Sequence, residues 1–468
     1  MSEFLRIGKA PLGEIQEKSH SNSQRRTPTM TPRESLSRRT FLKVSGTFAG
    51  AAVLAACAPV APADGGAMGE EAMAEPVTIR YGRHDPAAGV ATTLESFQEE
   101  YPDIVVSVEQ IGEFHAKIPA LAAAGTLPDV VRSWEAMALD LGRNNQFIDI
   151  QPYVDGEPGY DADDFYENWW NYPVVEGKRF GIPDAAAPHI TFYNADLFDA
   201  AGVEYPNKDS FTWTDFEEKA RGISDPDNKI WGSETIPVGW HMYSVKQAWQ
   251  NGGSYYSPDF RECWLDKEET IQAIQFWADM LLDGNVMPSP SQIVGIGGAG
   301  AAAELLAAGK IGMQRMGSWV TGSLVDAGFR FNVVAEPSQT QRDTITHGAF
   351  NNISTTSENK DTAWIWLNYN TSTQGIYNYA SNANFPGTRR SSNEIEPFPW
   401  VADVDFEVDW DVVPDALTYG HILPGPANEG EALKLIGDAL DKVYSGDVQA
   451  ADVFPEVAPK VTAVISDV

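Results

Sequence analysis

Cysteine and basic side chains are scarce in this sequence. The 468 residues include two cysteines, Cys57 and Cys263, and 33 Lys and Arg against 66 Asp and Glu, which gives a formal net charge of −33. Two cysteines cannot build a disulfide framework, so stability has to come from packing. A strongly negative surface repels nucleic acids and anionic lipid headgroups. The composition therefore argues against nucleic-acid binding and against polyanionic ligands, and it favours a neutral or cationic ligand.

The sequence also lacks an apolar run long enough to span a bilayer. The apolar stretch near the N-terminus, residues 44–56, has 13 residues, whereas a transmembrane helix needs about 20. Arg38 and Arg39 precede this stretch and Cys57 follows it directly. Paired arginines before a short apolar segment are typical of a twin-arginine secretion signal, and residues 54–57 have the form of a bacterial lipobox. We therefore expect export, cleavage before Cys57, and anchoring of Cys57 by lipid to the outer face of the cell membrane.

Removal of this signal changes the charge balance and leaves one cysteine. Residues 1–56 hold nine of the basic and four of the acidic side chains, so the rest of the chain has a formal net charge of −38. Residues 57–76 are rich in Ala, Pro, Gly and Glu without periodicity, which predicts a flexible tether. With Cys57 lipidated, Cys263 has no intrachain partner and is expected to be a structural thiol. The remaining chain of about 412 residues predicts two or three domains.

Strand and helix patterns alternate in the first part of the expected folded body. Residues 77–81, 104–108 and 128–131 are typical of strands, with helices expected near 94–97 and at 114–124. This alternation predicts an α/β architecture with covered sheets. Later the helical patterns dominate, and the clearest are 213–222, 270–282, 301–308, 363–369 and, last, 431–444. Thr212 or Thr214 is expected to cap the helix at 213–222.

Several short sequence segments, in their order along the chain, resemble those of a known family. The first is the expected helix with its aromatic-Pro turn at 94–104, and the second is the run of small residues followed by Gly and Pro-Asp-Val at 121–130. The others are the segments 177–183, 192–198, 309–313 and 317–319. Together they resemble the extracellular solute-binding proteins of ABC importers, in the group that contains maltose-binding protein. The resemblance covers about residues 77–468. One departure is Tyr81-Gly82-Arg83-His84, where the family often has Trp.

The resemblance implies a two-lobed, periplasmic-binding-protein-like fold of type II with a ligand cleft between the lobes. Hinge crossovers near residues 190, 338 and 376 would join the lobes. The N-terminal lobe would then hold residues 77–189 and 339–376, and the C-terminal lobe residues 190–338 and 377–468. Such a protein would be a monomer that closes on its ligand. Its partners would be a membrane permease and an ATPase on separate chains, since no ATPase motif occurs here.

Aromatic rings in predicted loops are the first candidates for a sugar site. Sugars present apolar C–H faces and hydroxyl edges, so flat rings and hydrogen-bonding groups suit them. Trp134 follows an expected strand, at the kind of edge where α/β sheets bind ligands, and Trp240 lies in a Gly-flanked loop. Trp319 and Phe350 resemble cleft-facing positions of the family. Trp169 and Trp170 are weaker candidates. For each ring the alternative is packing, as expected for Trp277, Trp364 and Trp366.

Three polar residues complete the candidate site. Glu135 follows Trp134, and Asp184 follows Pro183, both in predicted cleft-edge loops. Arg389 resembles a positive residue that the family carries near the cleft. The candidate ligand-binding residues are thus Trp134, Glu135, Asp184, Trp240, Trp319, Phe350 and Arg389.

Motifs for cofactors, metals and catalysis are absent or incomplete. Residues 295–300 match G-x-G-x-x-G, but the strand before it and the acid about 20 residues after it are missing. The histidines lack metal-ligand spacing. Paired acids such as Asp163 and Asp164 are inevitable in so acidic a chain. We therefore expect a binding protein without cofactor, metal or enzymatic activity.

The predicted function is capture of a solute, most simply a mono- or oligosaccharide, for an ABC importer. One alternative is the same scaffold binding a glycerol phosphodiester or a cationic compound; a phosphate would require a cluster of Arg or helix N-termini. Another is a surface-anchored glycoside hydrolase, which would need two carboxylates facing one ligand.

Overall fold

The structure, a computed structural model, describes residues 75–466 with the exception of 86, 235–240, 290–291, 293–301, 424 and 427. The chain divides into two compact units, Met1–Ala72 and Met73–Val468, and only the second contains described residues. The predicted secretion signal, Cys57, Trp240 and residues 295–300 lie outside the described residues.

A mixed sheet runs through the second unit. Its strands follow the order β2-β1-β3-β10-β6-β8-β7, and β9 also pairs with β6. The strands are β1 (Val77–Arg83), β2 (Ile104–Gln110), β3 (Val130–Trp134), β6 (Ile182–Asn194), β7 (Trp231–Ser233), β8 (Ile311–Gly317), β9 (Phe331–Val334) and β10 (Thr346–Ile353). β1 is parallel to β2 and β3, whereas β10 is antiparallel to β3 and β6. The predicted α/β class is confirmed.

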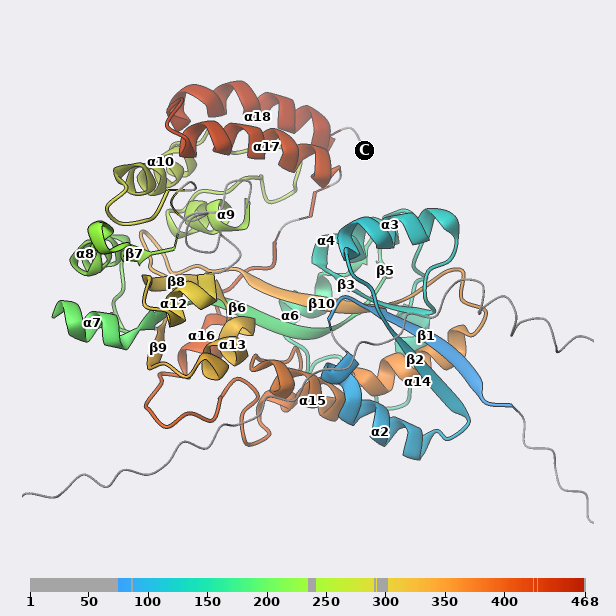
Figure 1. Cartoon of the computed structure of the whole chain (residues 1–468). Helices are drawn as coiled ribbons and strands as arrows, with labels where there is room; N and C mark the ends of the chain where they lie inside the picture. Colours follow the sequence, from blue (N-terminus) through green and yellow to red (C-terminus); the bar gives the residue numbers. More distant parts are fainter. Residues whose placement is uncertain are drawn as a thin grey trace, which may run out of the picture. The chain divides into compact units, whose positions relative to one another are not determined.

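Strand β6 is shared by two halves of the sheet. Residues 182–188 pair with β10, and residues 189–194 pair with β8 and β9. All 13 residues of β6 are buried, as expected for a strand covered on both faces. Figure 1 shows β6 and β10 running between two groups of helices. The crossover between lobes that we expect near residue 190 lies at the point where the pairing of β6 changes from β10 to β8 and β9.

The first half contains β1, β2, β3 and the part of β10 that pairs with β3. Its helices are α2 (Ala91–Glu100), α3 (Phe114–Ala124), α4 (Glu135–Arg143), α5 (Gln151–Gly156), α6 (Glu167–Asn171), α14 (Lys360–Asn370), α15 (Thr373–Ala383) and the 3-10 turns η1 (Ala87–Val90) and η5 (Ser391–Asn393), with a hairpin of β4 (Val174–Val175) and β5 (Lys178–Arg179). Its main core contains Ile79, Phe97 and Trp366. Ile376 and Tyr379 of α15 pack in that same core, so the lobe boundary expected at 376 falls inside a helix of this half.

The second half packs helices on both faces of β6, β8 and β9. They are α7 (Ala195–Ala201), α8 (Trp213–Ile223), α9 (His241–Gln250), α10 (Glu268–Asp283), α12 (Ala302–Ala307), α13 (Thr321–Ala327), α16 (Val412–Ala416), α17 (Glu429–Tyr444), α18 (Ala450–Ser466) and the 3-10 turns η2 (Pro226–Asn228) and η4 (Ser318–Val320). One core contains Trp277 and Ile436, and the core on the other face contains Ile190 and Phe331.

Capping residues place the helix ends. α3 ends at Gly125, whose φ of 66° is the left-handed conformation that glycine adopts without strain. Thr212 caps α8 in a capping box with Asp215, which decides between the two threonines considered. Trp277, Trp364 and Trp366 are buried as expected for core residues. Helix α18 was not predicted.

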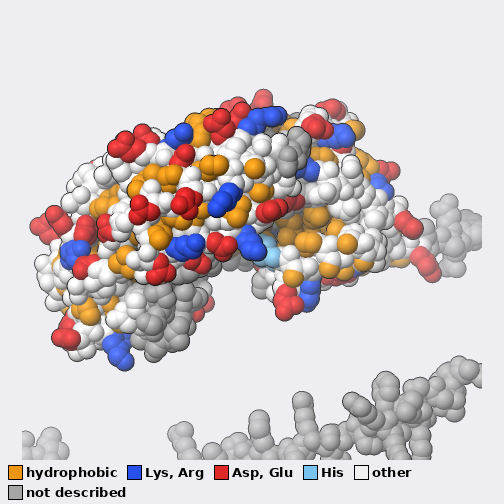
Figure 2. Space-filling model, turned by 90° about the horizontal axis from the view of Figure 1, so that it is seen from above, with side chains coloured by type: hydrophobic (Ala, Val, Ile, Leu, Met, Phe, Trp, Pro, Cys, Tyr) orange, Lys and Arg blue, Asp and Glu red, His pale blue; other side chains and the backbone are white. Residues whose placement is uncertain are grey.

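One face of the molecule carries charged side chains of both signs (Figure 2). On the face seen in Figure 2, acidic and basic side chains are interspersed, with apolar side chains between them. Among the described residues, no helix has both the length and the apolar character needed to cross a membrane. The same part of the chain contains no group of three or more His, Cys, Asp and Glu that could hold a metal ion.

Candidate functional site

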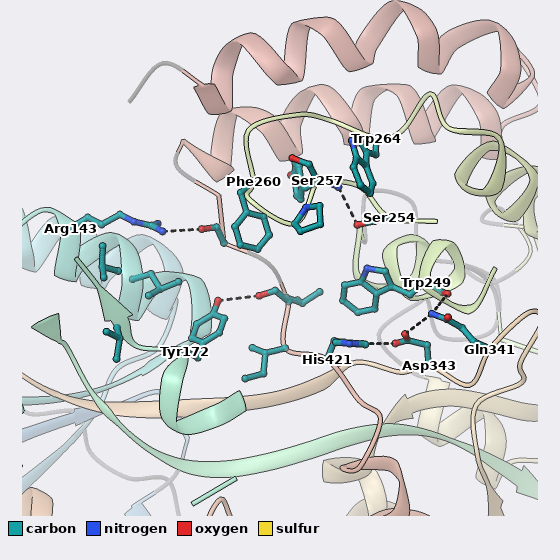
Figure 3. A pocket seen from close by; sticks show the side chains of 18 residues that line it. Arg143, Tyr172, Trp249, Ser254, Ser257, Phe260, Trp264, Gln341, Asp343 and His421 are labelled. Carbon is teal, nitrogen blue, oxygen red and sulfur yellow. Dashed lines mark hydrogen bonds and ion pairs between the residues drawn. The ribbon is translucent and has the colours of Figure 1, made fainter. Parts of the chain in front are cut away.

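A cavity of about 540 Å³ lies between residues of the two halves (Figure 3). One wall comes from α4 and from residues 172–175, and the facing wall comes from the end of α9 and residues 254–264. The lining is completed by Gln341, Asp343, His421, Ile422, Leu423 and Gly425. This volume lies within the range of about 300–1,000 Å³ that small-molecule sites occupy.

Five aromatic rings line the cavity. They are Tyr172, Trp249, Tyr256, Phe260 and Trp264. The ring of Tyr172 stacks on that of Phe350, with centroids 5.4 Å apart and planes at 14°. Flat apolar rings with a polar edge bind the C–H faces of polyols as well as other apolar surfaces. The lining therefore suits a neutral ligand with flat apolar faces.

Polar side chains gather at the floor of the cavity. The Asp343 carboxylate lies 3.0 Å from Nδ1 of His421, and Nε2 of Gln341 donates to the carbonyl of Trp249 at 2.9 Å. This contact with Asp343 raises the pKa of His421, and burial raises the pKa of Asp343. His421 remains 62% exposed. The floor thus presents the imidazole of His421 to a ligand, and the buried carboxylate of Asp343 holds this ring in place.

Two hydrogen bonds tie the first wall to the segment that leads to α17. The Tyr172 hydroxyl donates to the carbonyl of Leu423 at 3.1 Å, and Nη2 of Arg143 donates to the carbonyl of Gly425 at 3.1 Å. Both donors belong to the first half, whereas α17 packs in the second (Figure 3). These contacts hold the two walls together in this arrangement.

Glu135 and Trp319 do not line the cavity but lie in a second group of side chains around His347. Glu135 begins α4, one turn before the cavity residue Leu139. Its Oε1 accepts from the Gly348 amide at 2.6 Å and lies 3.3 Å from Nδ1 of His347. Trp319 is 38% exposed, and its ring centroid lies 5.4 Å from those of both His189 and His347. The structure therefore brings Glu135 and Trp319 to the same histidine.

Trp134 lies between two other histidines. The centroids of His84 and His115 are each 4.3 Å from that of Trp134, and Phe114 contacts it edge-on. Trp134 is not among the residues that line the cavity. Phe350 is fully buried and does not line the cavity, but it stacks on Tyr172, which does.

Asp184 and Arg389 are buried in separate polar networks of the first half. Asp184 accepts two hydrogen bonds from Arg132, at 2.7 and 3.0 Å. Arg389 donates to the carbonyls of Thr371 and Asp161, at 2.8 and 2.9 Å. Neither lines the cavity. Of the two weaker candidates, Trp169 is buried, and the ring of Trp170 carries the guanidinium of Arg179 at 3.6 Å.

Sequence reasoning did not single out the residues that line the cavity. Tyr172, Trp249 and Trp264 carry no local motif, and Asp343 reaches His421 across 78 residues. The only local signal is the Gly252-Gly253 pair after α9, which turns the chain near Trp249.

Comparisons with known proteins agree on one family. The family described as bacterial extracellular solute-binding protein matches residues 83–376. A putative binding protein of Brucella abortus is 22% identical over 385 residues, which cover 79% of this chain and 88% of that protein. The arabinooligosaccharide-binding protein of Bacillus subtilis is 22% identical over 284 residues, 53% of this chain and 62% of that protein.

A solved structure shares the fold. It is the ABC substrate-binding protein of Listeria monocytogenes in complex with cycloalternan, which superposes with a TM-score of 0.75 at 23% identity. The match covers 83% of this chain and 98% of that one. The two-lobed fold predicted from the sequence is thereby confirmed.

Proposed function

Because the chain belongs to the bacterial extracellular solute-binding protein family, we propose that it serves an ABC importer and captures a carbohydrate between its two lobes. It then delivers this ligand to a membrane permease that is driven by a separate ATPase. It acts as a monomer and binds its ligand without catalysing a reaction.

The aromatic cavity is the observation that carries this proposal. Five rings and a small set of polar groups face one space of about 540 Å³ between the halves. Stacking rings and an exposed imidazole held by a carboxylate match the apolar faces and hydroxyl edges of a sugar. The oligosaccharide names of relatives such as the Bacillus subtilis protein support the same ligand class.

Closure of the two lobes supplies the signal to the permease. A ligand that touches both walls of the cavity binds more tightly when the walls are close, so it shifts the population toward the closed form. Such a movement would change the hydrogen bonds that Arg143 and Tyr172 donate to the carbonyls of Gly425 and Leu423. We place the lobes at about 77–189 with 339–393, and 190–338 with 400–466, because α15 packs with the first core and α16 with a core of the second half.

Export and anchoring complete the proposed role. Arg38-Arg39, the apolar residues 44–56 and Cys57 would place the protein outside the cytoplasmic membrane, held by lipid on Cys57. A tethered receptor stays near its permease, which raises its effective concentration there. The extracellular family supports export.

A thermal-shift screen tests the function. The full chain carrying Cys57→Ser is screened with maltotriose, arabinotriose, tagatose and glycerophosphocholine. A carbohydrate at 100 times its Kd should stabilise the fold by about 2.7 kcal/mol. A shift with glycerophosphocholine alone would overturn the carbohydrate assignment, and hydrolysis of either trisaccharide would overturn the binding role.

A further inference from the structure

Two histidines meet at the strands that both halves share. His189 belongs to β6 and His347 to β10, and their ring centroids lie 5.2 Å apart. Trp319 contacts both rings. We refer to His189 and His347 as the histidine pair.

The proton of His189 has a defined position. Nζ of Lys246 lies 3.2 Å from Nδ1 of His189 and 2.7 Å from Oε1 of Glu336. Burial lowers the pKa of Lys246 to about 8, so at pH 7 it remains mostly a cation that only donates. Burial and Lys246 hold the pKa of His189 well below its usual range. The neutral ring therefore accepts at Nδ1 and carries its hydrogen on Nε2.

His347 has the opposite arrangement. Its Nδ1 lies 3.3 Å from Oε1 of Glu135, which also accepts from the amide of Gly348. A carboxylate only accepts hydrogen bonds, so Nδ1 carries the hydrogen. In the neutral ring Nε2 is then an acceptor.

Both Nε2 atoms lack a partner. Each is buried, and neither has a hydrogen bond to any part of the chain that the structure describes. A buried polar atom without a partner costs about 1–3 kcal/mol. The histidine pair thus leaves one donor and one acceptor unsatisfied beside an exposed tryptophan.

We propose that the histidine pair binds a hydroxyl group of the ligand, with Nε2 of His189 donating to the oxygen and Nε2 of His347 accepting its hydrogen. This inference rests on the proposed function. A hydroxyl donates and accepts at once, whereas a carboxylate or phosphodiester has no hydrogen for His347 and an ammonium has no lone pair for His189. The pair therefore selects a neutral hydroxyl over a charged group at this point. Trp319 moves off the two rings to admit it.

Titration calorimetry tests the proposal. The ligand is whichever of maltotriose, arabinotriose and tagatose binds the full chain most tightly. His189→Phe and His347→Phe keep the ring shape and should each weaken binding about tenfold. The control is Tyr153→Phe, which removes a hydrogen bond to Asp361 and should leave the affinity unchanged. Unchanged affinity in both histidine variants would overturn the proposal and leave the proposed function intact. No binding of any of the three sugars by the wild-type chain would overturn both.

Nitrogen NMR of the wild-type chain provides a measurement that does not depend on the folding of variants. Long-range ¹H–¹⁵N spectra should show His189 with its hydrogen on Nε2 and His347 with its hydrogen on Nδ1. Saturation with the same sugar should shift both Nε2 resonances. Reversed tautomers, or Nε2 resonances that do not move, would contradict the proposal.

Discussion

Buried charged side chains in this protein differ in what compensates them. Asp184 is paired with Arg132 through two hydrogen bonds, and Glu336 is paired with Lys246. Glu429, at the start of α17, is 8% exposed, and burial together with Asp140 and Glu135 raises its pKa to about 8. The ion pairs of Asp184 and Glu336 offset the cost of burying these carboxylates, whereas the surroundings of Glu429 do little to stabilise its charged form.

Glu429 makes the stability of the protein depend on pH. Because its pKa is higher in the folded than in the unfolded chain, the folded state holds the proton more tightly. Stability from this group is therefore present below the unfolded pKa of about 4.3 and is lost as the pH rises through about 8. Glu429→Gln should raise the free energy of unfolding by about 1–3 kcal/mol at pH 8 and change it little at pH 4. Urea unfolding at the two pH values measures this, and equal effects at both would contradict it.

Trp319 should contribute directly to ligand affinity. Its ring lies over Gly317, where an added Cβ would be 1.8 Å from it, and 38% of the residue is exposed. Trp319→Ala should weaken binding of the tightest sugar of the screen about tenfold by calorimetry, since a stacking surface is lost. Phe398→Ala is the matched control, because Phe398 is also 38% exposed but stacks on Trp400 and not on the histidine pair. Equal affinities of the two variants would remove Trp319 from the site.

At the scale of secondary-structure elements, the pairing of strands β6 and β10 positions the histidine pair. The backbones approach closely there, since a Cβ at Gly348 would lie 2.0 Å from the carbonyl oxygen of Ala185 and 2.5 Å from Trp169. Glycine at 348 therefore allows β10 to pair with β6 while Glu135 binds its amide. The close strand pairing fixes where His347 stands.

Gly348→Ala should lower the stability of the fold. The added methyl group overlaps backbone that has no room to move, which costs about 1–3 kcal/mol. Gly437→Ala is the opposite case, because nothing lies within 4 Å of its Cβ position in α17, and alanine favours a helix by about 0.5–1 kcal/mol. Chemical denaturation of both variants should move the midpoints in opposite directions; a midpoint for Gly348→Ala at or above wild type would contradict the argument.

Local sequence patterns predicted many helices and strands, but they did not predict which distant residues contact one another. The helix at 114–124 and the capped start of α8 depend on neighbouring residues, and both were predicted. Helix α18 was missed because Pro455 and Pro459 interrupt its pattern. The roles of the charged candidates depend on distant residues, since Asp184 meets Arg132 across 52 positions. Nothing near Asp184 in the sequence indicates that pairing.

At the scale of the whole molecule, the proposed function depends on two halves that meet around one cavity. The cavity takes residues from both, and the hydrogen bonds of Tyr172 and Arg143 to residues 423 and 425 are among the contacts that hold them. A ligand in this space adds contacts to both walls at once. The expected response is a shift toward a more closed population.

X-ray scattering should detect this closure. The radius of gyration of the full chain should fall when the tightest sugar of the screen is added. In Tyr172→Phe with Arg143→Met, the ligand-free protein should be more open and the fall on ligand addition larger, because two contacts between the walls are absent. An unchanged radius at saturation would contradict closure.

The shared strand β6 restricts how this protein can be recombined. Its residues 182–188 pair in one half of the sheet and residues 189–194 in the other, so a break at residue 190 would cut the strand that joins the two halves. Neither half can be produced alone as a sensor module. A chimera with a relative of different specificity would have to take β6 and β10 from the same parent. Such an exchange would move this strand pair as one piece.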